Sequence, residues 1–166
     1  KSVVALPPAD DRTFLAFVEA GTQDHADQYF LPVALLWQSV SDTPGTLSPR
    51  LIAKTRHGAH EGVLVDASAL PGFGPDLLRT MQDRAVLAAA GGELRFTATQ
   101  AADAIDVDGV EGRIAGGEQS NTSMLLGDRA VVKIYRRLEP GIHPEIEMGR
   151  FLTEAGFANS PALLGA

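Results

Sequence analysis

The sequence predicts an α+β fold: a small sheet packed on one helix, followed by a second group of strands with its own helix. Short runs rich in Val, Leu and Phe alternate with Gly, Pro and Asp clusters, a pattern typical of strands separated by turns. Helical spacing of apolar residues is clear in two segments, after Pro75 and after Pro144. Hydrophobic residues make up 45% of the 166 residues and charged residues 21%, which is the balance of a globular protein.

The first half contains strands and one helix. Its predicted strands are Ser2–Leu6, Thr13–Glu19, Tyr29–Gln38, Leu51–Thr55 and Gly62–Asp66. Pro75 suits the first turn of a helix, where its missing N–H costs nothing. The apolar residues that follow, Leu78, Met81, Ala85 and Ala88, recur at helical spacing. We expect this helix to end at Gly91-Gly92, because glycine tolerates the left-handed turn beyond a helix C-terminus.

The second half repeats the strand and helix pattern on a smaller scale. Predicted strands are Leu94–Thr99, Arg113–Gly117, Met124–Leu126 and Ala130–Tyr135, with Gly127-Asp128 as a turn pair. A helix is expected from Pro144 to about Ala155, where Gly156 closes it. The composition changes near residue 91, which predicts two domains, 1–91 and 92–166. The abrupt start, in what reads as the middle of a strand, predicts a fragment of a longer protein.

Charge and composition exclude several classes of function. The formal net charge is −7, which argues against nucleic acid as a partner, because phosphates demand an excess of Lys and Arg. The sequence contains no Cys, which excludes disulfides and Cys-ligated zinc and suits the cytoplasm. No apolar run approaches the roughly 20 residues of a membrane helix, so no membrane association is expected. His57 and His60 have no convincing third partner, so we expect no metal site.

A polar, glycine-containing loop is the first candidate for ligand binding. Glycine allows backbone to approach a ligand, and short hydroxyl and amide side chains beside backbone N–H groups can cradle phosphate oxygens. An ordinary hairpin turn has the same composition, so the loop alone does not decide between the two. The candidate residues are Gly116, Gly117, Ser120, Asn121, Thr122 and Ser123.

Lys133 strengthens the phosphate hypothesis. It lies in the middle of an apolar strand, on the same face as Val131 and Tyr135, where an ammonium group needs a partner. An edge strand that uses lysine against aggregation is the structural alternative. In a protein-kinase-like N-lobe, such a lysine holds nucleotide phosphates and pairs with a helix glutamate. Glu147 is the predicted partner because it shares a helix face with Phe151, which we expect to pack on the sheet, and Glu145 is the fallback.

Several stretches resemble the bacterial maltokinase family, most closely the maltokinase-like region often fused to trehalose synthase. The resemblance rests on residues 118–123, 127–129, 132–141 and Pro144 with 147–154, about a quarter to a third of the chain. A looser likeness to the N-terminal cap of that family covers residues before about 91. The resemblance implies an α+β fold with a small curved sheet-plus-helix cap domain, followed by a protein-kinase-like N-lobe that consists of an antiparallel sheet with one helix.

The resemblance also implies a function: transfer of the ATP γ-phosphate to maltose, giving maltose 1-phosphate in trehalose and glycogen metabolism. Lys133, Glu147 and the 116–123 loop would then bind ATP. The catalytic aspartate and the Mg²⁺ ligands would lie on a C-lobe that this chain lacks, so we expect the fragment alone to be inactive. The His25-Ala26-Asp27 triplet precedes the lysine strand and is rejected as a catalytic loop.

Two other functions remain open at the level of sequence. The chain could be a non-catalytic docking module in a fusion protein, with a trehalose synthase domain as its partner. It could also be the N-lobe of a related glucosamine kinase, since acceptor specificity is expected in the C-lobe.

Two further cations, Arg136 and Arg137, lie close to Lys133 in the sequence. Successive residues of a strand point to opposite faces, so at most one of these arginines can join Lys133.

Overall fold

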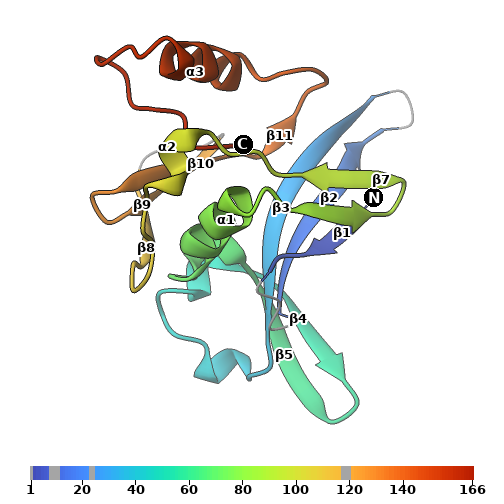
Figure 1. The fold of residues 1–166 in the computed structure, drawn as a ribbon. Coiled ribbons are helices and arrows are strands. Elements are labelled where there is room, and N and C mark those ends of the chain that lie inside the picture. The colour runs from blue at the N-terminus through green and yellow to red at the C-terminus, as the bar shows by residue number, and fades with distance from the viewer. Residues whose placement is uncertain (1, 8–11, 23–24, 117–120) are drawn as a thin grey trace.

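The computed structural model describes residues 2–7, 12–22, 25–116 and 121–166, and within these ranges it is a mixed α+β protein with mostly antiparallel sheets. The large sheet has the strand order β1-β2-β3-β5-β4, and a short strand, β11, also pairs with β3 (Figure 1). Its strands are β1 (Ser2–Ala5), β2 (Thr13–Gly21), β3 (Ala26–Leu36), β4 (Leu51–His57), β5 (His60–Asp66) and β11 (Arg137–Leu138). The structure confirms the predicted α+β class.

The remaining strands form a three-stranded sheet and a separate hairpin. The small sheet is a meander of β8 (Gly112–Ile114), β9 (Asn121–Leu126) and β10 (Ala130–Tyr135), with β9 in the centre. The hairpin consists of β6 (Val86–Ala89) and β7 (Gly92–Arg95). The helices are α1 (Phe73–Gln82), α2 (Gln100–Asp103) and α3 (Pro144–Glu154), with 3-10 turns η1 (Val40–Asp42), η2 (Ser48–Arg50) and η3 (Ala67–Ala69).

One hydrophobic core connects the two halves of the chain. Alternating residues of the large sheet point toward α1, and alternating residues of the small sheet meet the same helix from its other side. Fully buried side chains in this cluster come from both halves: Leu15, Ala34, Val63, Val65, Met124 and Leu126. Packing is close where α1 passes the small sheet, since a Cβ added to Gly74 would lie 2.6 Å from Leu126 Cδ2.

The segment after α1 differs from the sequence prediction. The helix ends at Gln82, and Arg84 adopts a positive φ of 51°, which reverses the chain direction. Val86–Ala89 then forms β6 rather than a continued helix, and it pairs with β7 across a turn that contains Gly91. The predicted domain boundary at residue 91 therefore falls inside a hairpin, and the core continues across it.

A second link between the halves follows β10. Arg137 pairs with Tyr29 in the β11–β3 register, and the backbone N–H of Phe30 donates to the carbonyl of Arg136 at 2.8 Å. The small sheet and the large sheet are thus joined by backbone hydrogen bonds as well as by the core.

Among the helices of the described ranges, none has the length and apolar character that crossing a membrane would require.

Replacing Leu126 with alanine is expected to lower the free energy of unfolding by about 2–5 kcal/mol, because it leaves a cavity between β9 and α1. Leu125→Ala is the matched control, because Leu125 is the neighbouring residue on the outer face of β9. It is expected to lower the free energy of unfolding by less than about 1.5 kcal/mol. Urea unfolding followed by circular dichroism measures both. Equal losses for the two variants would contradict the assignment of the inner face.

Candidate functional site

The candidate site lies on the outer face of β10, beside the start of α3. Val132 and Ile134 are 9% and 3% exposed and face the core, so alternation places Lys133 on the opposite face of the strand. The Lys133 side chain keeps 32% of its surface exposed. Lys133 is therefore near the surface, with its ammonium group at the junction between the strand and the helix.

Glu145, in the first turn of α3, forms an ion pair with Lys133. The Lys133 Nζ atom lies 2.8 Å from Oε2 and 3.1 Å from Oε1 of Glu145. The Tyr135 hydroxyl donates to the same Oε2 atom at 2.5 Å. Hydrogen bonds from Lys133 and then Tyr135 stabilise the charged carboxylate and lower the pKa of Glu145 below its ordinary value.

His143 holds the first turn of α3 in place. It is the N-cap residue, and its Nδ1 atom accepts a hydrogen bond from the backbone N–H of Glu145 at 3.3 Å. Its ring also lies against the Tyr135 ring, with centroids 3.9 Å apart. Pro144 follows at the first helical position, where proline is well tolerated. Together these contacts place the Glu145 carboxylate above β10.

The predicted partner Glu147 lies elsewhere on the helix surface. The prediction assumed that Phe151 packs on the sheet, but Phe151 is 64% exposed and shares its outward face with Glu147. Glu145 instead shares a face with Gly149, which lies against the side chain of Leu163. The rotation of α3 therefore brings the fallback residue, Glu145, to Lys133.

The polar loop is only partly described. Gly117 and Ser120 lie outside the described residues, and Gly116 is exposed. Ser123 is directly opposite Lys133 in the β9–β10 register, and Asn121 is opposite Tyr135, so both belong to the outer face that carries the lysine. The structure thus brings Ser123 and Asn121 next to the site.

Thr122 points to the other side of β9. Its side chain is buried at 9% exposure, and its Oγ1 atom accepts hydrogen bonds from Arg136 Nε at 3.2 Å and Nη2 at 2.9 Å. The Thr122 hydroxyl therefore serves the interior and not the face of Lys133, which corrects its place among the predicted ligand-binding side chains. The alternation of Thr122 with the buried Met124 and Leu126 is the sequence signal for this position.

Arg136 is the centre of a polar network on the interior side. Its Nη2 atom lies 2.7 Å from Asp66 Oδ2 and 3.2 Å from Ser68 Oγ, in addition to its contact with Thr122. Asp66 also caps η3 by accepting from the Ser68 backbone N–H. Arg137 pairs with Asp27 at 2.9 Å. Both arginines thus have structural partners, and neither joins Lys133.

Tyr135 and His143 are the residues of this cluster that the sequence prediction missed. Tyr135 is two positions after Lys133, so strand alternation places both on one face, and this was the available signal. For His143, the only signal in the sequence was its position directly before Pro144, since the residue before the first helical position often caps a helix. Lys133 Nζ also lies 5.4 Å from the centroid of the Tyr135 ring.

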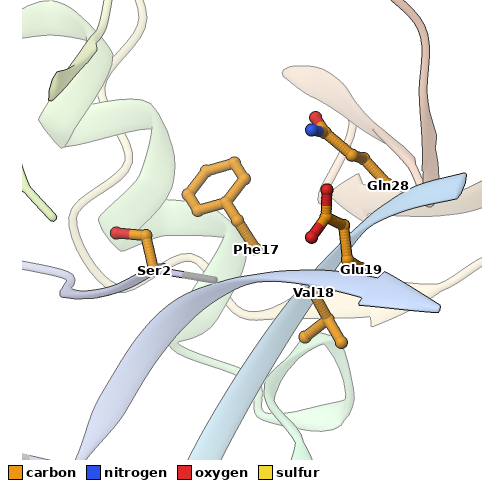
Figure 2. A pocket seen from close by; sticks show the side chains of 5 residues that line it. All are labelled: Ser2, Phe17, Val18, Glu19 and Gln28. Atoms are coloured by element: carbon orange, nitrogen blue, oxygen red, sulfur yellow. The ribbon is translucent and has the colours of Figure 1, made fainter. Parts of the chain in front are cut away.

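A small pocket lies at a different place, on the large sheet. Figure 2 shows Ser2, Phe17, Val18, Glu19 and Gln28 around it, from β1, β2 and β3. Glu19 and Gln28 are cross-strand partners, and their side chains lie close together in this view. Among the described residues, none of those predicted for phosphate binding lines this pocket, which is separate from the cluster around Lys133.

The chemistry of the site is set by the Lys133 ammonium group. An ammonium group carries three N–H donors and a full positive charge, which are the properties that phosphate oxygens bind. Within the part of the chain that the structure describes, no group of three His, Cys, Asp or Glu side chains is placed to hold a metal ion. No protein-family model matches the sequence.

Proposed function

We propose that this chain is the cap and the nucleotide-binding N-lobe of an ATP-dependent sugar kinase of the maltokinase type. The observation that carries the proposal is the ion pair between Lys133 on β10 and Glu145 on α3. A strand lysine held by a carboxylate of the following helix is the arrangement with which protein-kinase-like folds hold the phosphates of ATP. The reaction proposed is transfer of the γ-phosphate to maltose, giving maltose 1-phosphate.

The order of elements supports this assignment. The polar segment that leads into β9 comes first, then the turn at Gly127-Asp128, then β10 with Lys133, and then α3 with Glu145. The register pairs Ser123 with Lys133, so a small hydroxyl side chain belongs to the same face of the small sheet as the lysine. Phosphate oxygens would then meet one cation and neutral donors on a single face of the small sheet.

In this proposal each residue of the pair has a separate role. Lys133 orients the phosphates and neutralises their charge, while Glu145 orients Lys133. The catalytic aspartate and the Mg²⁺ ligands are assigned to a C-lobe outside these 166 residues, so the chain alone is expected to be inactive. The residues that select the acceptor sugar are assigned to the same C-lobe, and glucosamine is the alternative acceptor.

A docking role is the second candidate, and the surface of α3 favours it. No residue of this helix is buried within the described part of the chain, and Met148 and Phe151 are 56% and 64% exposed. Ile142 just before the helix and Phe157 just after it are also exposed. Apolar side chains gathered in this way are typical of a surface that meets another domain, such as a kinase C-lobe or a trehalose synthase domain.

Exchanging the two candidate glutamates for glutamine tests the assignment. In the longer polypeptide with its C-lobe, Glu145→Gln is expected to lower kcat/KM for maltose phosphorylation about 10- to 100-fold, because Lys133 loses its charged partner. Glu147→Gln is the matched control and is expected to stay within about threefold. The assay follows maltose 1-phosphate formation from ATP. A larger loss for Glu147→Gln would reverse the assignment, and a wild-type polypeptide without activity on maltose or glucosamine would overturn the proposed function.

A further inference from the structure

The Tyr135 side chain is placed where it controls the geometry of the ion pair. It is the last residue of β10, and its hydroxyl donates to Glu145 Oε2, the same oxygen that lies 2.8 Å from Lys133 Nζ. At neutral pH a phenol is an uncharged donor, since its ordinary pKa is about 10. The carboxylate thus accepts hydrogen bonds from the charged Lys133 ammonium group at both oxygens and from the neutral Tyr135 hydroxyl at Oε2, and both donor residues belong to one strand.

The ring of Tyr135 is itself fixed in place. The His143 ring lies against it at 3.9 Å between centroids, with the ring planes inclined by 33°. His143 also caps α3 through Glu145, so the ring contact ties the strand to the first turn of the helix. The ring that carries the Tyr135 hydroxyl therefore contacts the same residue that caps the helix.

The attachment of α3 makes this contact important. The helix has no buried residue among those described, and a further polar contact lies near its C-terminal end, where Thr153 Oγ1 accepts from the Leu163 N–H at 2.7 Å. The first turn, which carries Glu145, is thus held largely by the side chains of the strand and by its cap. A bond from Tyr135 restricts the carboxylate where core packing does not.

We propose that Tyr135 is a positioning residue, whose hydroxyl fixes the Glu145 carboxylate so that Lys133 is held in one orientation for phosphate. The consequence for nucleotide binding rests on the proposed function, whereas the positioning of Glu145 does not. Tyr135 touches the carboxylate and not the reacting atoms, so its effect is exerted through Glu145 and Lys133.

The test replaces the hydroxyl and keeps the ring. Tyr135→Phe preserves the ring contact with His143 and removes the donor to Glu145. Tyr29→Phe is the matched control, because Tyr29 is the other of the two tyrosines in the chain and lies on β3. The first measurement is the titration of the Glu145 carboxyl carbon by NMR in the 166-residue chain. The second is KM for ATP and kcat in the longer polypeptide.

We expect Tyr135→Phe to raise the pKa of Glu145 toward its ordinary value, because one donor to the charged form is lost. KM for ATP is expected to rise about three- to tenfold, with a smaller change in kcat and an unfolding midpoint close to that of Tyr29→Phe. An unchanged titration of Glu145 would overturn the inference. A raised pKa with unchanged KM and kcat would support the positioning of Glu145 and count against the proposed nucleotide site.

Discussion

Replacing Arg136 with alanine is expected to lower the free energy of unfolding by about 2–4 kcal/mol. The guanidinium group joins Asp66, Ser68 and Thr122, and it is only 18% exposed. Its removal leaves the Asp66 carboxylate, which is 17% exposed, without its cationic partner. Because these contacts join β10 to the end of β5 and to η3, the loss affects the connection between the two sheets.

Arg137→Ala is the matched control for this prediction. Arg137 is the next residue, it pairs with Asp27 at 2.9 Å, and its side chain is 57% exposed. A surface ion pair of this kind contributes less than about 1 kcal/mol. Urea unfolding followed by circular dichroism compares the two variants at neutral pH. If both variants lower the free energy of unfolding by the same amount, the Arg136 network does not stabilise the connection between the two sheets.

Lys133→Ala is expected to lower kcat/KM for maltose phosphorylation about 10²- to 10³-fold in the longer polypeptide. The variant removes the cation that the proposal assigns to the phosphates, and it leaves the Glu145 carboxylate facing them instead. Phosphate and carboxylate then repel each other, so both ATP binding and transfer are affected.

Lys54→Ala is the control for the loss of a lysine. Lys54 lies on β4 of the large sheet and is exposed, so its replacement is expected to change kcat/KM by less than about twofold. A coupled assay for ADP release measures both variants under the same conditions. Activity of Lys133→Ala within a few-fold of wild type would show that Lys133 has no role in phosphate binding.

The strand that carries the lysine could be predicted closely from sequence. Ala130–Tyr135 is β10 as predicted, because three β-branched residues flank Lys133 and a Gly-Asp turn precedes the strand. The start of α3 at Pro144 was also predicted, from the preference of proline for the first helical turn. Both features depend on residues within a few positions of each other.

The errors come from features that depend on tertiary contacts. Ala-rich residues after Gln82 favour a helix by local propensity, yet Val86–Ala89 pairs with β7 next to β1. The choice between Glu145 and Glu147 depends on the rotation of α3, in which Gly149, on the same helix face as Glu145, lies against Leu163. Spacing along the sequence carries no information on this contact, which is why the less favoured glutamate proved to be the partner.

Calorimetric titration of the longer polypeptide with MgATP tests most directly whether the Lys133–Glu145 pair forms a nucleotide site. We expect saturable binding for the wild type and for Lys54→Ala. For Lys133→Ala we expect a Kd at least about tenfold higher, with an unchanged unfolding midpoint. Equal Kd values for wild type and Lys133→Ala, or no binding of MgATP by the wild type, would contradict the account.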